Sequence, residues 1–162
     1  MKSLLAAVGA RCHGGLGHIR RVVDVGCGKG HLTAALASAL DVPALGLDFD
    51  AELLVAARAL YPSVVFEARD IVDEGLPCVQ GDLVVGLHPC GCLGEAVVSA
   101  VACHPCDVTL LMVPCCWHKQ RAPYREALSA AGASSGRLRL PHAALKKASM
   151  ALDASRSEPS RR

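Results

Sequence analysis

Residues 22–31 read V-V-D-V-G-C-G-K-G-H and carry the pattern from which we predict the fold. The β-branched run 22–25 predicts a short strand buried on both faces, as in a parallel sheet. Gly26, Gly28 and Gly30 then follow at alternate positions. Glycine permits unusual φ angles and lets a ligand touch the main chain, while a helix that starts there directs free N–H groups past the loop. The stretch therefore predicts a strand, a loop open to a ligand, and a helix from His31.

Apolar patterning extends this unit into an alternation of strands and helices between residues 22 and 131. The predicted strands are 22–25, 44–48, 63–68, 82–87 and 108–113. The predicted helices are 2–9, 31–40, 51–60, 93–102 and 123–131, the last one stopping at Gly132. Such alternation predicts an α/β fold with a doubly wound, mostly parallel sheet covered on both faces, whose ligands bind beyond the carboxyl ends of the strands. We expect one domain in residues 1–150 and a disordered tail in residues 151–162.

The composition of the chain indicates its cellular environment but says little about its function. The chain has 162 residues with 17 basic and 15 acidic side chains, so the overall charge of +2 gives no argument for nucleic acid. Nine cysteines, an odd number, occur without a secretory signal, and no apolar stretch approaches the ~20 residues needed to span a bilayer. We expect a cytoplasmic protein with reduced thiols and no membrane contact; a nuclear location and the oligomeric state stay open.

The spacing of the glycines excludes two common nucleotide sites. The loop reads G-x-G-x-G, whereas dinucleotide sites use G-x-G-x-x-G and phosphate loops end in G-K-[ST]. These differences argue against NAD and ATP. The plainer alternative is that Gly26–Gly30 is only a tight turn between strand and helix.

Three acidic residues favour a different ligand. Asp48 closes the second strand, where its carboxylate can accept both hydroxyls of a ribose. Asp70 follows the third strand and is placed to accept a hydrogen bond from an adenine amino group. Asp24 lies in the first strand, close to where an ammonium or sulfonium would lie. A ligand with a ribose, an adenine and a positive amino-acid part fits these acids, and S-adenosylmethionine is such a ligand.

The same residues resemble a known family. Val22–Leu32 is similar to the first motif of class I S-adenosylmethionine-dependent methyltransferases, Leu45–Asp48 to the second and Glu67–Asp70 to the third. The resemblance covers residues 20–131 and implies the Rossmann-like methyltransferase fold, with the cofactor across the first three strand ends.

A narrower resemblance lies further along the chain. Residues 27–32 (C-G-K-G-H-L), 86–91 (G-L-H-P-C-G) and 114–119 (P-C-C-W-H-K) are similar to a eukaryotic subgroup. It includes the methyltransferase-like 25 proteins and the glutathione S-transferase C-terminal-domain-containing proteins. A more distant relative is a tRNA methyltransferase family that methylates a ribose hydroxyl in the acceptor stem. The final antiparallel hairpin of the fold is hard to find, because residues 137–140 offer only one strand, so the activity of this short form is open.

Cysteines and histidines gather in the second half of the chain, and three interpretations of them stay open. The cluster comprises His88, Cys90, Cys92, Cys103, His104, Cys106, Cys115, Cys116 and His118. In the first interpretation, His88 or His118 orients the acceptor or removes its proton. In the second, zinc binds residues from both loops, although the spacing is irregular. In the third, Cys90 and Cys115 act like the paired cysteines of RNA cytosine-5 methyltransferases.

The sequence thus favours an enzyme that transfers a methyl group from S-adenosylmethionine to RNA or protein, with RNA first. We expect His88, Cys90 and His118 to line the acceptor side, and no metal ligand is assigned. Lys119, Arg121 and Arg125 offer phosphate contacts or simply a solvated face. The alternative is a non-catalytic methyltransferase-like module that serves as a scaffold.

Overall fold

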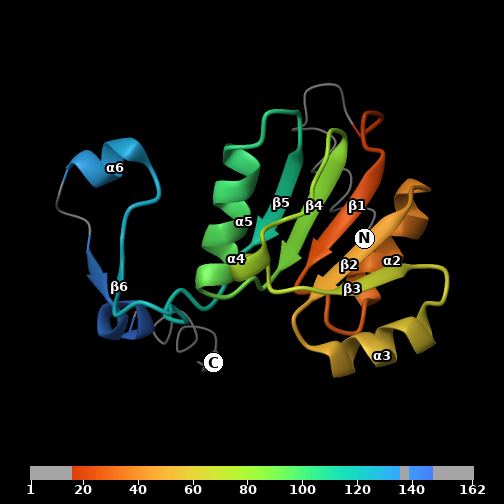
Figure 1. Ribbon diagram of the computed structural model, residues 1–162, viewed down its shortest axis with the longest axis horizontal. Helices are drawn as coiled ribbons and strands as arrows, with labels where there is room; N and C mark the ends of the chain where they lie inside the picture. Colours follow the sequence, from red (N-terminus) through yellow and green to blue (C-terminus); the bar gives the residue numbers. More distant parts are fainter. Residues whose placement is uncertain (1–15, 136–138, 148–162) are drawn as a thin grey trace, which may run out of the picture.

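Five parallel strands form the centre of the protein. The computed structural model describes residues 16–135 and 139–147 (Figure 1). The strands are β1 (Arg21–Val25), β2 (Ala44–Asp48), β3 (Val65–Ala68), β4 (Asp82–Leu87) and β5 (Thr109–Val113). Their order in the sheet is β3-β2-β1-β4-β5, and every neighbouring pair is parallel. The order reverses between β1 and β4, which confirms the doubly wound sheet and places its ligand crevice at the carboxyl ends of these two strands.

Helices cover both faces of this sheet. Helices α2 (His31–Leu40) and α3 (Ala51–Leu60) lie on one face, and α4 (Ile71–Glu74) and α5 (Cys92–Ala102) on the other. Leu36 of α2 packs with Val22 of β1, whereas Val97 of α5 packs with Val23. Consecutive residues of a strand point to opposite faces, so these contacts separate the two layers.

The first loop is fixed by a close contact as well as by its turn. Gly30 is the N-cap of α2 and has a φ of +77°. A Cβ at Gly30 would lie 2.5 Å from the ring of Phe66, and a Cβ at Gly46 on β2 would lie equally close. The Phe66 ring therefore packs against bare backbone from two elements, which explains two of the glycines without any ligand.

Predictions for the chain after β5 are partly wrong. Only the last two residues of the helix expected over 123–131 are helical: Tyr124–Arg125 form β6, which pairs antiparallel with β7 (Leu140–Pro141). The following helix α6 (Ala130–Ser134) begins after Ser129, whose hydroxyl accepts a hydrogen bond from the Gly132 amide, so Gly132 lies inside a helix rather than at its end. Figure 1 shows β6 and α6 beside the five-stranded sheet, not within it.

Some expectations cannot be compared with the structure. The helix over 2–9 and the tail over 151–162 lie outside the described residues, and so does the first half of the strand expected at 137–140. Within the described residues, the longest helices are too short to cross a bilayer. The cellular compartment stays a prediction.

Candidate functional site

Asp48 faces the glycine loop across the carboxyl end of the sheet. Its side chain is only 8% exposed. The Gly28 amide donates to Asp48 Oδ2 at 2.8 Å, and the Asp50 amide donates to Oδ1 at 3.0 Å. A carboxylate offers about four acceptor positions, so two amides leave room for the two hydroxyls of a ribose. The structure therefore brings Asp48 and Gly28 together as the sequence predicts, and this pair suits an adenosyl ligand.

The three loop glycines have different roles. Gly26 and Gly28 both have positive φ angles, +69° and +54°. A Cβ at Gly28 would meet no atom within 4 Å, and one at Gly26 would meet only the side chain of Leu93 at 3.6 Å. Gly30, by contrast, is required by the Phe66 ring. The backbone with room for a ligand is therefore Gly26–Gly28, whereas the placement of Gly30 is explained by packing.

Asp24 lies beneath this loop rather than on its surface. The side chain is 1% exposed, and the Thr33 hydroxyl of α2 donates to Asp24 Oδ2 at 2.6 Å. Burial raises the pKa of Asp24 to about 6, and the negative charge of Asp48 adds to that effect while the Thr33 hydrogen bond opposes it. A group this buried would act on the positive part of a cofactor through its charge, and that role stays a prediction.

We expect Asp24→Asn to stabilise the fold at neutral pH. The folded-state pKa of about 6 lies above the ordinary 3.8, so the contribution of Asp24 to stability is greatest below pH 4 and is lost as the pH rises to 6. A shift of this size corresponds to about 3 kcal/mol, of which the amide should recover about 1–3 kcal/mol at pH 7.5. Denaturant unfolding between pH 4 and 7.5 measures the effect.

Asp82 on β4 provides the matched control. It is equally buried, but Arg21 Nε and Nη2 donate to its carboxylate at 2.9 and 2.7 Å. Asp82→Asn leaves the Arg21 guanidinium without its anion and should destabilise the fold by roughly 2–3 kcal/mol. If both substitutions destabilise equally at pH 7.5, the account of Asp24 is wrong.

Asp70 has partners that the sequence did not indicate. The Val72 amide donates to its Oδ1 at 2.9 Å, which caps α4, and Arg121 Nη2 donates to its Oδ2 at 2.8 Å. Arg121 also pairs with Asp73. Asp70 therefore joins α4 to the chain that follows β5, and its proposed bond to an adenine shares the carboxylate with Arg121.

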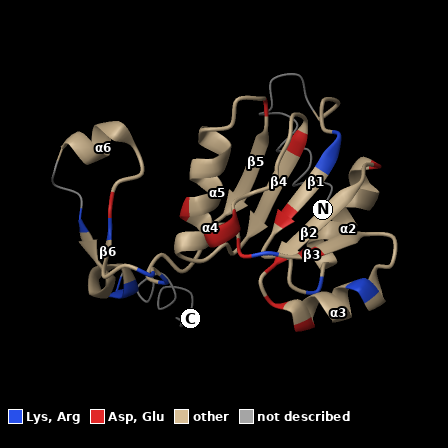
Figure 2. Cartoon of the chain, viewed as in Figure 1, with Lys and Arg blue, Asp and Glu red and all other residues tan. Residues whose placement is uncertain are grey.

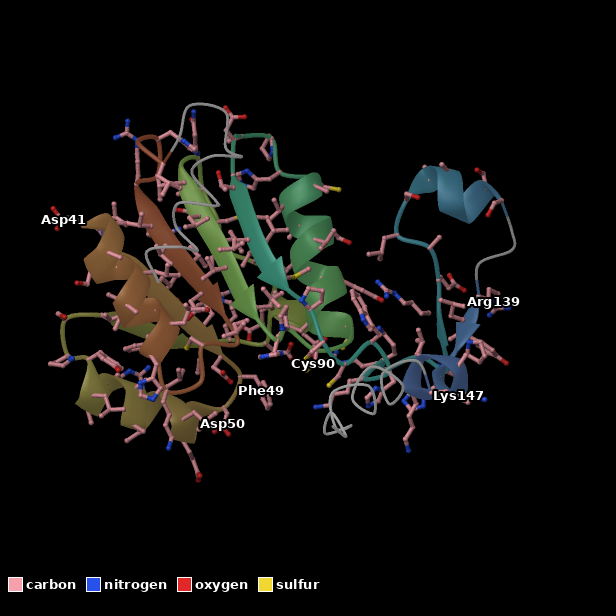
Figure 3. The ribbon with its side chains drawn as sticks, turned by 180° about the vertical axis from the view of Figure 1, so that it is seen from behind. Asp41, Phe49, Asp50, Cys90, Arg139 and Lys147 are labelled. Atoms are coloured by element: carbon pink, nitrogen blue, oxygen red, sulfur yellow. The ribbon has the colours of Figure 1, made fainter. Side chains whose placement is uncertain are left out.

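Phe49 is a residue that sequence reasoning missed. It directly follows Asp48 and is 78% exposed, a high value for a large apolar side chain. Figure 3 shows Phe49 and Cys90 at the same edge of the sheet, where the strands end. An aromatic residue directly after a strand-ending acid, in a chain with only two phenylalanines, could have indicated it.

Two loops meet on the acceptor side, after β4 and after β5. The His88 amide donates to the Val113 carbonyl at 2.9 Å, and the Cys92 amide donates to the Lys119 carbonyl at 3.2 Å. Gly91 has a φ of +57°, and any Cβ there would overlap the Lys119 carbonyl group. The two loops thus form one packed unit.

The side chains expected on that unit are placed as follows. Cys90 Sγ lies 3.0 Å from Cys115 Sγ. His88 is exposed and has a φ of +64°, which is unusual for a residue with a side chain. The His118 ring lies edge-on to that of His142, with centroids 5.9 Å apart. The structure therefore brings the free thiols of Cys90 and Cys115 into contact and places His118 beside His142, a neighbour that the sequence does not indicate.

Two further cysteines, Cys27 and Cys78, pack as small apolar residues in the core. Cys27 packs beside Phe66, and burial raises the pKa of its thiol to about 12. Cys78 is buried, and burial raises its pKa too. Neither thiol is suited to nucleophilic chemistry.

Comparisons with known proteins agree with this fold. A model of the methyltransferase domain family matches residues 15–123, about two thirds of the chain. The chain belongs to this methyltransferase domain family. The solved structure of S-adenosylmethionine-bound CalS10, an amino pentose methyltransferase from Micromonospora echinaspora, is 25% identical with a TM-score of 0.55 and covers 70% of this chain and 48% of its own. DesVI of Streptomyces venezuelae, 19% identical with a TM-score of 0.56 and the same coverage, shares the fold.

Curated relatives match a shorter stretch. Trans-aconitate 2-methyltransferase of Rhizobium etli is 39% identical over 57 residues, which are 35% of this chain and 22% of that protein. A putative methyltransferase of Invertebrate iridescent virus 6 is 34% identical over 58 residues, with the same shares. The chain thus matches about a fifth of the length of these relatives. The expected class I fold and S-adenosylmethionine as the cofactor are confirmed, and the residues of the loop fit that cofactor.

Proposed function

We propose that this methyltransferase domain transfers a methyl group from S-adenosylmethionine to RNA. Bound S-adenosylmethionine supplies an electrophilic methyl group on a sulfonium. The chain's own contribution is to hold the cofactor, align the acceptor and accept its proton. The narrower resemblance, to the methyltransferase-like 25 and glutathione S-transferase C-terminal-domain-containing proteins, belongs to this proposal.

The residues that would hold S-adenosylmethionine lie at the carboxyl ends of β1 and β2. Asp48 would accept the ribose hydroxyls, and the open backbone at Gly28 would accommodate the amino-acid part. The exposed Phe49 ring offers an apolar face to the adenine, with Asp70 as acceptor for its amino group. Together these residues provide one contact for each chemical part of the cofactor.

RNA is proposed as the acceptor because acidic and basic residues are unevenly distributed along the chain. Residues 16–113 contain five Lys or Arg and twelve Asp or Glu, a net charge of −7. Residues 114–147 contain seven Lys or Arg and only one acid, Glu126, a net charge of +6. Figure 2 shows Lys and Arg around β6 and Asp and Glu on α4, whereas α3 carries both kinds of charge. The near-zero total conceals a basic segment that starts at the acceptor side, as a polyanionic substrate requires.

The basic segment is not fully neutralised by ion pairs. Among the described residues, Arg121 pairs with Asp70 and Asp73, Arg125 with Glu95, and Arg139 with Glu126. Lys146 and Lys147 are exposed and make no ion pair with a described residue. Free lysines suit phosphate contacts, and this observation favours RNA over a protein acceptor.

Transfer of tritiated methyl groups from S-adenosylmethionine to total RNA and to protein extract tests the proposal. We expect label in RNA, and a loss of roughly 100-fold or more in His88→Ala or His118→Ala if that histidine is the base. Cofactor binding, measured by calorimetry, should be retained in both variants. Label confined to protein would replace RNA by a protein acceptor, and cofactor binding without any transfer would favour the scaffold alternative.

Charge reversal tests the basic segment separately. Lys147→Glu should weaken RNA binding and lower the slope of log affinity against log salt by about 1. Arg20→Glu reverses one exposed charge just before β1, at the opposite end of the sheet, and should leave that slope unchanged. Equal slopes in the two variants would contradict the proposed RNA surface. Filter binding across a salt series provides the measurement.

A further inference from the structure

Three thiols meet between the two acceptor-side loops. Cys90 comes from the loop after β4, and Cys115 and Cys116 come from the loop after β5. Their three Sγ atoms all lie within 4.8 Å of one another, and all three side chains are half-buried. Residues 25 positions apart converge here because β4 and β5 are neighbouring parallel strands, so both loops leave the same edge of the sheet.

The spacing of these sulfur atoms suits a tetrahedral metal ion. Zn–S bonds of ≈ 2.3 Å in a tetrahedron place two sulfur atoms about 3.8 Å apart. The Sγ atoms of Cys90 and Cys115 are 3.0 Å apart, and the other two separations do not exceed 4.8 Å. Small side-chain rotations would therefore bring all three thiolates to one ion.

The sulfur atoms are also a suitable kind of ligand for zinc. Soft divalent ions prefer thiolates, and a cation between the three sulfur atoms would offset the repulsion between thiolates held this close.

The backbone around the thiols is already fixed. The Trp117 amide donates to the Cys115 carbonyl at 3.0 Å, and the Lys119 amide donates to the Cys116 carbonyl at 3.1 Å. Gly91 and Lys119 hold the second loop against the first, as described above. A pre-arranged backbone lowers the ordering cost of binding a metal.

We propose that Cys90, Cys115 and Cys116 form a Zn²⁺ site that holds together the loops after β4 and β5. The three thiols release three protons and bind as thiolates without any redox change, and the fourth position is open to water. From the sequence no metal ligand is assigned, and zinc bound between the two loops is one of three open interpretations; the proposed site selects that interpretation and names three ligands. It also assigns Cys90 to the metal rather than to the acceptor.

Metal binding to the full chain, purified reduced and without chelator, tests the site. We expect about one equivalent of zinc, consistent with tight structural sites, and sulfur-to-metal charge-transfer absorption when Co²⁺ replaces zinc. Cys90→Ser, Cys115→Ser and Cys116→Ser should each weaken metal affinity by at least about 100-fold, because even outer-shell changes cost 10–100-fold. The double variant Cys103→Ser/Cys106→Ser removes the exposed C-x-x-C pair as a matched control and should bind like the parent protein.

Two results would overturn the site. One is metal affinity that is unchanged in Cys90→Ser, and the other is a Cys90–Cys115 disulfide as the only stable state of a protein that binds neither Zn²⁺ nor Co²⁺. Both readouts are independent of methyl transfer. Failure of the metal site therefore leaves the proposed function standing, and failure of methyl transfer leaves the metal site standing.

Discussion

Asp48→Ala should weaken binding of S-adenosylmethionine by about 100-fold or more. Two hydroxyl hydrogen bonds to a carboxylate contribute ~1.5–3 kcal/mol each, and every ~1.4 kcal/mol is a factor of ten in affinity. The substitution also removes the acceptor for the Gly28 amide at 2.8 Å, so the loop itself loses a fixed point. Isothermal titration calorimetry with S-adenosylmethionine measures the loss.

Asp50→Asn is the matched control for this prediction. Asp50 lies two residues further on, and its carboxylate only caps α3 by accepting from the Glu52 and Leu53 amides. Asparagine caps helices about as well as aspartate, so cofactor affinity should be retained. A variant Asp48→Ala that is folded and binds the cofactor as tightly as Asp50→Asn would exclude the ribose role of Asp48.

Gly91→Ala should separate the two acceptor-side loops and abolish methyl transfer while cofactor affinity is retained. The φ of +57° and ψ of −126° suit only glycine, and the added methyl group would overlap the Lys119 carbonyl. The strained backbone costs ~1–3 kcal/mol, and overpacking adds about 1–3 kcal/mol. Denaturant unfolding and the tritiated methyl assay report the two consequences.

Gly75→Ala isolates the steric part of that effect. Gly75 also has a positive φ, +81° with ψ 168°, but a Cβ there would meet no atom within 4 Å. Gly75→Ala should therefore lose only the ~1–3 kcal/mol of stability that the strained backbone costs. The variant should keep its methyl transfer activity. If Gly91→Ala is as stable and as active as Gly75→Ala, the packed unit of two loops does not matter for the reaction.

The first half of the fold follows closely from local sequence. The predicted helices 31–40 and 51–60 match α2 and α3, because the glycine loop starts one and Tyr61-Pro62 ends the other. The strand-ending Asp48 was found for a similar reason, since strand ends mark where a parallel sheet binds ligands. In this half of the chain, local signals are strong enough to predict both the helix boundaries and the edge of the sheet where the cofactor binds.

The second half depends on contacts that are distant in sequence. The Arg121 pair with Asp70 joins residues 51 positions apart, and nothing local indicates it. The three thiols are likewise gathered by the pairing of β4 with β5. Residues 123–131 have helical composition, but Tyr124 and Arg125 pair with β7 instead, an example of long-range pairing overriding local preference.

A crystal structure with bound S-adenosylhomocysteine tests the central claim most directly. We expect both ribose hydroxyls within hydrogen-bond distance of the Asp48 carboxylate, with the amino-acid part of the ligand against the backbone of Gly26–Gly28. A ligand bound with its ribose away from Asp48, or with its amino-acid part away from this loop, would contradict the account.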